Sequence, residues 1–484
     1  MNYKLLLPLC LAATTLTACS FAPAYVRPTA PVSTQWPVAS TAQDGEQPRT
    51  IDIGWRSMFR SPKLQHLIEA SLANNRDLRI ATLNIEAARN TWRIQRSALL
   101  PSMNASGSFT RQEVSKSRSG TGQAEITSTY TAGIGTTAYE LDLFGRVRSL
   151  NNSAINKYLA TEEGRKAAQT SLVAEVANAY LTCLADIELL RLTESTLKTR
   201  QDAYDLIKRS FDLGAKSRLD VAQSAMLVES ARANRSQYQR RVEQDRNALT
   251  LLVGKEIDPK LLEPQPLADL EMLERLPVGI PSVVLLDRPD IRQAEYALKA
   301  ENANIGAARA SFFPGISLTG SAGYASTSLS DLFVSGSSSV WSFTPQVTLP
   351  IFQGGRLRSN LQLAETNRDI AVARYEKAVQ TAFREVADAL VARATCTEQW
   401  HAQQALVKES DQALTITKAR YDYSIDSHFA LLDAQRSLFE AQQNEILILN
   451  GSSGAKSLMH LICLLCSIKK FFYQASRETP RLSE

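Results

Sequence analysis

The sequence predicts a mixed, mainly α-helical chain of duplicated long-helix coiled-coil hairpins, with four strands of a transmembrane β-barrel. Three observations lead to this fold class. The chain aligns with itself, long proline-free stretches repeat apolar residues every seven positions, and four short stretches alternate apolar with polar residues. The formal net charge is only +5 over 484 residues, without a concentrated block of Lys and Arg. We therefore expect no nucleic-acid partner.

An internal repeat divides the chain. Residues 76–108 align without a gap on residues 289–321, which places Pro101 on Pro314. Farther along, "GRVRS" aligns with "GRLRS" and "EVANA" with "EVADA". We interpret this as an old duplication. The expected segments are a first repeat at 63–254, a proline-rich linker at 255–287 and a second repeat at 288–450.

Each repeat contains one very long predicted helix. From about Phe144 to Phe211 there is no proline and little glycine, so a continuous helix would approach about 100 Å. Apolar residues recur in it every seven positions, as in coiled-coil packing: Val176, Cys183, Leu190, Leu197, Tyr204 and Phe211. Because Cys183 belongs to this stripe, we interpret it as a small core residue rather than a reactive thiol.

The helical pattern breaks once in each repeat and then resumes. The breaks lie between Asp212 and Ser217 and between Asp422 and Ser427. They predict the tips of helix hairpins, so each repeat folds back along its own long helix.

The four alternating stretches are expected at about 102–112, 127–139, 315–325 and 340–351. Pro101 and Pro314 mark the junctions where a helix stops and a strand begins, because proline cannot continue a helix. Four strands cannot close a barrel, so the strands of several copies must join. Two copies would give a barrel of eight strands, and three would give twelve. The polar face of the strands, which carries Ser, Thr and Gln, favours the wider barrel with a water-filled interior. The alternative is a soluble hairpin packed on the helices.

The N-terminus has the pattern of an exported lipoprotein. Residues 1–18 predict a signal peptide, because Lys4 precedes a short apolar run that closes on "LTACS". That ending resembles the bacterial lipobox, which implies covalent diacylglycerol and an N-acyl lipid on Cys19 and no other cofactor. Ser20 then favours the outer membrane. The alternative is an ordinary cleaved signal with a free thiol. Residues 19–62 are expected to form an extended, lipidated segment.

Together these features resemble the outer-membrane efflux proteins of the TolC type, in the lipoprotein branch that serves resistance-nodulation-division pumps. The resemblance rests on "CSFAPAYVRP", "GWRSMF", "AYELDLFGR", "PIFQGGRLRS" and "SHFALLDAQRSLFEAQ". It implies a homotrimer with a twelve-stranded β-barrel in the outer membrane and a helical α-barrel through the periplasm. Such a trimer is a passive duct, in contact with outer-membrane lipid and docked on a periplasmic adaptor and an inner-membrane pump.

The resemblance also implies a gate at the periplasmic end of the duct. The family's acidic ring and the residues that hold it match Asp433, Tyr421, Arg436, Phe429 and Asp220. The alternative is that Asp433 and Arg436, three apart on a helix, form an ordinary exposed pair. The tips that would contact the adaptor are represented by Gly214, Ser217, Ser424 and Ser427.

The sequence also bears on functions other than an efflux duct. The four histidines show neither metal spacing nor a nucleophile partner, so we expect no enzyme and no metal site. A duct for protein secretion or metal efflux and a periplasmic coiled-coil scaffold lipoprotein remain alternatives.

At 451–484, "GSSG" and a stretch without amphipathic repeat replace the expected helix, which indicates a frameshifted tail or a lineage-specific one.

Overall fold

The structure is a computed structural model that describes residues 21–33, 55–120, 122–264, 282–334 and 338–466. The chain forms two compact units. One, here called the strand unit, comprises Met1–Thr29, Asn84–Glu162 and Gln293–Glu376. The other, the hairpin unit, comprises Ala30–Leu83, Glu163–Arg292 and Lys377–Glu484.

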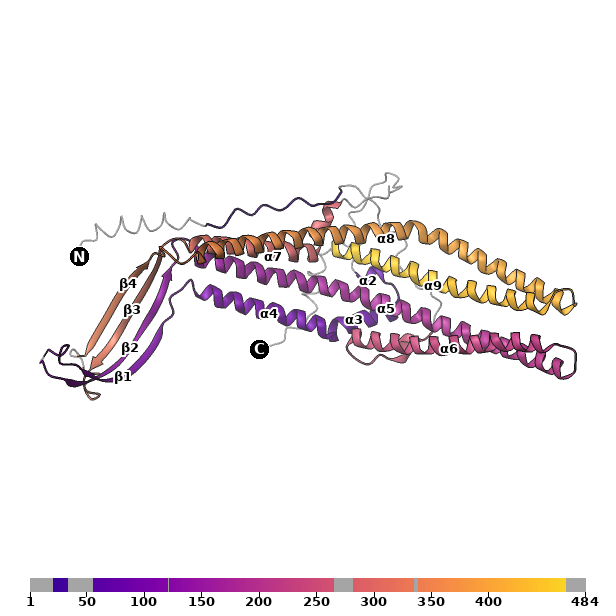
Figure 1. Ribbon diagram of the computed structural model, residues 1–484, viewed down its shortest axis with the longest axis horizontal. Helices are drawn as coiled ribbons and strands as arrows, with labels where there is room; N and C mark the ends of the chain where they lie inside the picture. Colours follow the sequence, from indigo (N-terminus) through magenta and orange to yellow (C-terminus); the bar gives the residue numbers. More distant parts are fainter. Residues whose placement is uncertain (1–20, 34–54, 121, 265–281, 335–337, 467–484) are drawn as a thin grey trace. The chain divides into compact units, whose positions relative to one another are not determined.

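The strand unit holds one antiparallel sheet of four strands in the order β1-β2-β3-β4 (Figure 1). The strands are β1 (Asn104–Val114), β2 (Glu125–Leu141), β3 (Gly315–Ser326) and β4 (Ser339–Thr348). These limits differ from the approximate expected ones by up to three residues: β1 is shifted along the chain, β2 is longer and β4 ends earlier. Alternation marks the strand, but pairing with its neighbour decides where it stops.

The first and second repeats meet where β2 pairs with β3, and the close approach of these two strands requires glycine. Gly133 faces Gly323 in the register. A Cβ atom built on Gly323 would lie 2.3 Å from the carbonyl oxygen of Ala132. The backbones approach too closely there for any side chain, so glycine at this position fixes the seam between the repeats.

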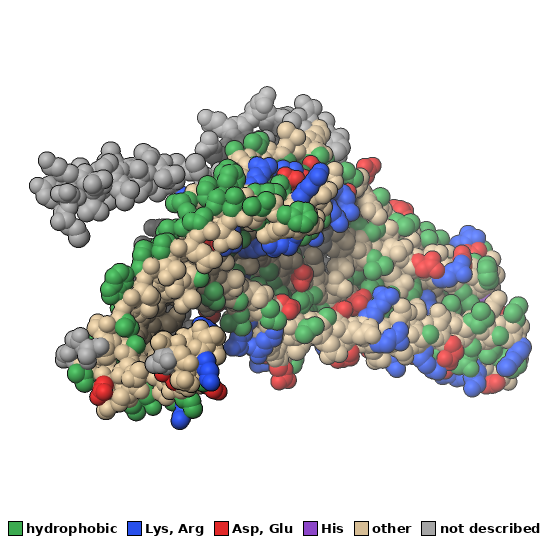
Figure 2. All heavy atoms as spheres, turned by 60° about the vertical axis from the view of Figure 1, so that its left-hand side comes forward, with side chains coloured by type: hydrophobic (Ala, Val, Ile, Leu, Met, Phe, Trp, Pro, Cys, Tyr) green, Lys and Arg blue, Asp and Glu red, His purple; other side chains and the backbone are tan. Residues whose placement is uncertain are grey.

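The outer strands and their apolar side chains are open to the surroundings. Within the described residues β1 pairs only with β2, and β4 only with β3. Every residue of β4 is exposed, including Trp341, Phe343 and Val347. Neither β3 nor β4 contains a charged residue, and Figure 2 shows charged side chains concentrated on the helices. In the part of the chain that the structure describes, apolar faces and the outer edges of β1 and β4 are thus left without partners.

The helices reproduce the expected duplication. The first repeat has α4 (Arg76–Ser97), α5 (Arg146–Asp212) and α6 (Arg218–Val253); the second has α7 (Pro289–Ala310), α8 (Arg356–Asp422) and α9 (His428–Cys466). Both α5 and α8 contain 67 residues, about 100 Å of helix at 1.5 Å per residue. Figure 1 shows α5 returning as α6 and α8 returning as α9. The mainly helical fold class with four strands is confirmed.

The core of the hairpin unit packs α5 and α6 against short N-terminal helices. These are α2 (Trp55–Met58) and α3 (Pro62–Asn74). Ser71 and Asn75 both donate side-chain hydrogen bonds to the carbonyl oxygen of Leu252. In the seven-residue stripe Cys183 is completely buried, and burial raises the pKa of its thiol to about 12. A thiol this reluctant to ionise is a packing residue.

The backbone of the last helix does not end where the sequence departs from the expected helical pattern. The backbone of α9 continues without interruption through the "GSSG" sequence to Cys466. Each of the two glycines, Gly451 and Gly454, costs the helix about 1 kcal/mol relative to alanine, and "AKSLMHLICLLC" supplies good helix formers immediately afterwards. The tail beyond Cys466 lies outside the described residues.

None of the described helices contains an apolar stretch long enough to cross a bilayer.

Candidate functional site

The sequence points to three places: the N-terminal segment, the helix–strand junctions and the hairpin tips. Cys19 lies outside the described residues, which begin at Phe21. The residues named from the sequence for the helix–strand junctions and the hairpin tips can all be located.

The N-terminal segment lies along α7 in the strand unit. The Phe21 ring stacks on that of Phe313 at 4.5 Å between centroids. Asn302 then donates a hydrogen bond of 2.7 Å from Nδ2 to the carbonyl oxygen of Pro23. Gly306 leaves room for this segment, because a Cβ there would meet Ala22 at 2.8 Å. These contacts hold residues 21–23 close to the helix surface.

Farther along, the N-terminal segment is held by a charged residue of α7, Glu295, which we call the Glu295 anchor. Its carboxylate accepts hydrogen bonds from Nε and Nη2 of Arg27, at 3.1 and 2.8 Å, and from the Tyr25 hydroxyl at 3.1 Å. Lys299 adds an ion pair at 3.0 Å. Burial opposes ionisation of Glu295, but the hydrogen bonds from Arg27 and Lys299 hold the pKa of its carboxyl below the usual range. No pattern in the sequence indicates this anchor, since Arg27 and Glu295 are 268 positions apart.

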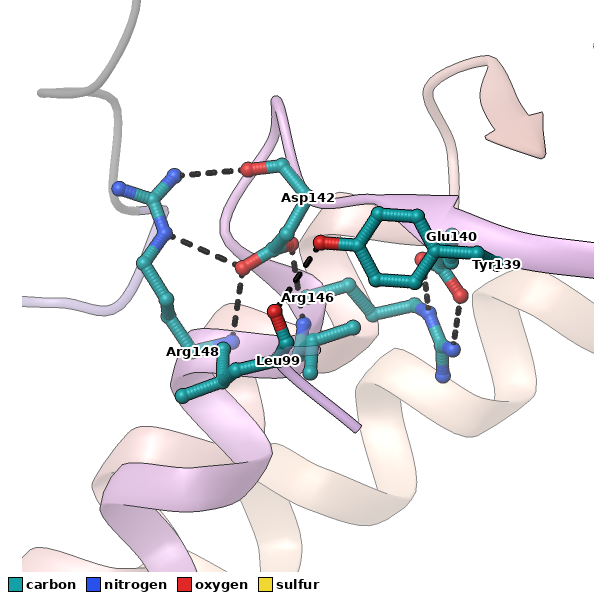
Figure 3. Close-up of polar contacts among 7 residues, drawn as sticks. Leu99, Tyr139, Glu140, Asp142, Arg146 and Arg148 are labelled. Atoms are coloured by element: carbon teal, nitrogen blue, oxygen red, sulfur yellow. Dashed lines mark hydrogen bonds and ion pairs between the residues drawn. The ribbon is translucent and has the colours of Figure 1, made fainter. Parts of the chain in front are cut away.

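Both junction prolines lie between a helix end and a strand start. Pro101 follows α4, which ends at Ser97, and precedes β1. Pro314 follows α7, which ends at Ala310, and immediately precedes β3. At the first junction the Tyr139 hydroxyl of β2 donates to the carbonyl oxygen of Leu99 at 3.0 Å (Figure 3).

Two acidic residues at the end of β2, Glu140 and Asp142, bind the first residues of α5 (Figure 3). Asp142 accepts hydrogen bonds from the backbone N–H groups of Val147 and Arg148, at 3.0 and 2.8 Å, and from Nε of Arg148 at 3.1 Å. Glu140 forms a two-point ion pair with Arg146. Asp142 therefore caps free helix donors at the positive end of the helix dipole, and each arginine has its own carboxylate.

The hairpin tips are built from caps and left-handed residues. Gly214 has a φ of 76° and Ser424 a φ of 59°. Ser217 and Asp220 form a capping box at the start of α6, and Ser427 accepts a hydrogen bond from the backbone N–H of Ala430 at the start of α9. Large apolar side chains are exposed at both tips: Leu213, Tyr423 and Ile425. The tips are thus capped turns with exposed apolar ends.

Two of the expected gate residues are brought together by a residue that the sequence interpretation missed. Buried His428 lies with Nδ1 3.5 Å from Oδ1 of Asp220, and its ring centroid is 5.7 Å from that of Tyr421. Nζ of Lys216 lies 4.8 Å from the centroid of the Tyr421 ring. This cluster joins the first hairpin tip to the second. Its signal in the sequence was a lone histidine beside a helix N-cap.

The remaining expected gate residues stay on α9. Asp433 forms an ion pair with Arg436, and their side chains are 46% and 58% exposed. Phe429 is 64% exposed. Within one chain, Asp433 and Arg436 therefore form the exposed helix pair that the sequence left as an alternative, with surface available to another molecule.

Long antiparallel helix hairpins attached to an open sheet with exposed apolar faces define a class of protein whose strands enter a membrane and whose helices project from it. The chain belongs to the outer membrane efflux protein family, whose model matches residues 67–255 and 280–451. The two matched stretches correspond to the two repeats. The match stops at residue 451, where the sequence departs from the expected helix pattern.

Named relatives cover nearly the whole chain. The probable efflux pump outer membrane protein TtgC of Pseudomonas putida is 50% identical over 442 residues, which are 91% of each protein. Outer membrane protein OprJ of Pseudomonas aeruginosa is 46% identical and covers 92% of this chain and 91% of its own. The open-state structure of the Neisseria gonorrhoeae MtrE outer membrane channel has a TM-score of 0.82 at 38% identity, and covers 93% of this chain and 99% of its own.

Proposed function

We propose that this chain is the outer-membrane channel of a tripartite efflux pump, passively conducting drugs or other small molecules out of the cell. The observation that carries the proposal is the open sheet, which presents apolar side chains and two unpaired edges in a chain whose relatives are efflux channels. In a bilayer each unpaired backbone group costs several kcal/mol, so these edges need partners.

Three copies satisfy the strand edges best. A homotrimer joins β1 of one chain to β4 of the next and closes twelve strands, which leaves a lumen, whereas eight strands fill with side chains. The α5/α6 and α8/α9 hairpins of the three chains then form the periplasmic tunnel. Lipids on Cys19 would anchor each chain in the outer membrane beside the barrel.

The exposed apolar tips support docking on a periplasmic adaptor, which connects the channel to an inner-membrane resistance-nodulation-division pump. Leu213, Tyr423 and Ile425 are exposed on turns held rigid by Gly214, Ser217, Ser424 and Ser427. A photo-crosslinking amino acid at Ser424 should capture one periplasmic protein in intact cells. The same probe at Arg374, on the exposed surface of α8 in the strand unit, should not capture that protein.

The gate proposal rests on Asp433, Arg436 and Phe429 being exposed near the second tip. In a trimer, three Asp433 carboxylates meeting on the axis would repel one another and attract cations, while Arg436, Tyr421 and Asp220 hold the helix positions. Replacing Asp433 with Ala should increase the conductance of the channel in planar bilayers. Unchanged conductance would contradict the assignment.

The function is tested by deleting the gene in a strain that lacks its other outer-membrane efflux proteins. The deletion strain is tested for susceptibility to antibiotics, dyes, organic solvents and metal salts. It should be more sensitive to organic compounds than the parent strain, and the wild-type gene should restore its resistance. Increased sensitivity to metal salts alone would favour metal efflux. Normal susceptibility to every compound would contradict an efflux function.

A further inference from the structure

A pair of carboxyl groups is enclosed between α5 and α6 in the hairpin unit, about seven helical turns from the tip that joins these helices. The side chain of Asp186 on α5 is only 11% exposed. Oδ2 of Asp245 on α6 is shielded from solvent and has no hydrogen-bond partner among the described residues. The two carboxyl groups are within hydrogen-bonding distance of each other. Two acids are therefore in direct contact in a largely dehydrated place.

A favourable contact between these two acids requires a proton. An ionised carboxylate offers only acceptor oxygens, so two carboxylates cannot hydrogen-bond to each other, whereas a protonated carboxyl can donate to an ionised one. Two like charges in contact also repel each other strongly away from water, and one of two adjoining carboxyl groups then keeps its proton. A proton held between Asp186 and Asp245 supplies the donor that this contact lacks.

The positive charge around the pair is too weak to neutralise both acids. Arg241 of α6 acts on both of them, but its Nη1 lies 4.0 Å from Oδ1 of Asp186 and its side chain is 44% exposed. Its guanidinium also lies 5.5 Å from the centroid of the Tyr238 ring. Farther along α6, Arg246 forms an ion pair of 2.7 Å with Glu243, and both side chains are exposed. One partly solvated arginine thus faces two acids.

The neighbouring helices add acid rather than counter-charge. Glu445 of α9 lies close to Glu188 of α5, and burial together with Glu188 raises the pKa of Glu445. Oε2 of Glu188 is itself shielded and has no hydrogen-bond partner in the described part of the chain. Gln443 of α9, which is neutral, donates to the Tyr238 hydroxyl at 3.2 Å. On the other side of α6, helix α3 carries ionisable groups that do not contribute to the pKa shift of Asp245: Lys63, His66 and Glu69.

We propose that Asp186 and Asp245 form a one-proton site that fastens α5 to α6. A proton taken up from the medium bridges the two helices, and its loss sets two carboxylates against each other and loosens the helices around them. The ligand is a proton rather than a metal ion, because no three His, Cys, Asp or Glu side chains of the described residues are grouped so that they could hold a metal.

The pKa of Asp245 gives the direction of this switch. Burial and the neighbouring Asp186 raise it to about 6. An acid whose folded pKa is raised contributes stability that is fully present below its unfolded pKa and is lost as the pH rises through the folded pKa. Acid therefore tightens the contact between α5 and α6, and the contact loosens as the pH rises through about 6.

The test uses the full-length protein in detergent and carries the H428F substitution throughout, so that the buried histidine at the tips does not titrate. Protection factors of the backbone amides next to Asp186 and Asp245 should fall as the pH rises, by up to about tenfold per pH unit above the pKa of the site. D245N should keep the protection of the acid form at every pH, because its neutral amide donates to Asp186 as the protonated acid does. The control E243Q removes an exposed carboxyl two positions away and should leave the pH profile unchanged.

Infrared spectroscopy detects the proton itself. Protein labelled with isotopically substituted aspartate should show the C=O stretch of a protonated aspartic acid, which fades as the pH rises through about 6. This band should be missing from D245N. It should also be missing from D186N, because Asp245 beside a neutral amide gains a hydrogen-bond donor and no longer needs the proton.

The outcomes separate a shared proton from simple packing. Equal pH profiles of protection with and without D245N would overturn the site. So would a D245N protein that is less protected at every pH but keeps the pH dependence, since Asp245 would then only pack against α5. A band that survives in D186N would assign the proton to Asp245 alone and overturn the sharing. If D245N does not fold, the infrared titration of the unsubstituted pair still decides, because absence of a protonated aspartic acid near pH 6 overturns the proposal.

Discussion

Nδ1 of His428 on α9 lies 3.5 Å from Oδ1 of Asp220 on α6, so the two hairpin tips of one chain meet at a buried imidazole. Burial lowers the pKa of His428, partly offset by Asp220, while Lys216 lowers it further. Hydrogen bonds from Ser217 hold the pKa of Asp220 below its usual range. The packed tip therefore favours the neutral imidazole.

This pKa shift predicts that acid loosens the tips. A histidine whose folded pKa is depressed contributes stability above its unfolded pKa of about 6.5, and that stability is lost as the pH falls from there toward the lower folded pKa. The protection factors of the backbone amides around Ser217 and Ser427, which compare the observed exchange rate with the intrinsic rate at the same pH, should fall as the pH is lowered from 7.5 to 5.5. The H428F variant should lose this pH dependence. Identical profiles for H428F and the wild type would rule His428 out as the cause.

Removing the carboxylate cap of α5 should destabilise the strand unit. We expect Asp142→Ala to lower the free energy of unfolding by about 1–3 kcal/mol, because two backbone donors and the Arg148 guanidinium lose their acceptor. Phe352→Ala, at the equivalent exposed position of the second repeat, should cost less. Denaturant unfolding of both variants measures the difference, and equal losses would show that Asp142 is not acting as a cap.

The Glu295 anchor should control release of the N-terminal segment. Replacement of Glu295 with Gln leaves Arg27 and Lys299 without their counter-charge, so residues 21–29 should detach more often. Limited chymotrypsin digestion after Tyr25, whose hydroxyl also binds Glu295, should become several-fold faster than in the wild type. Lys299→Gln is the milder control, since it leaves both Arg27 hydrogen bonds in place. If E295Q is cleaved at the wild-type rate, the anchor does not hold the segment.

Substitution of Gly323 should disturb the seam between β2 and β3. Even alanine would bring Cβ to 2.3 Å from the carbonyl oxygen of Ala132, so Gly323→Ala should reduce the yield of folded, heat-resistant protein in outer-membrane fractions. Gly107→Ala on β1 is the matched control, because its nearest neighbour would lie at 3.7 Å. Equal yields from the two variants would contradict the close approach.

The sequence was most informative where a pattern repeats and least where a contact joins distant single residues. Alternation and the seven-residue stripe predicted the strands, the long helices and both tips, because period and burial are coupled in these elements. The contact between Arg27 and Glu295 belongs to no repeating pattern, so periodicity could not predict it. His428 was overlooked because its role depends on the first hairpin tip, more than 200 positions earlier. The helix through "GSSG" shows that two glycines three positions apart do not end a helix that has good helix formers on both sides.

The claim that three open sheets close one barrel is tested most directly by crosslinking β1 to β4 between chains. Cysteine scans along Asn104–Val114 and Ser339–Thr348, in a background that keeps Cys19 but lacks the other cysteines, would be oxidised in intact outer membranes. If three chains close one barrel, one register should give covalently linked dimers and trimers and nothing larger. Crosslinks confined to single chains, or dimers as the largest product in every register, would contradict it.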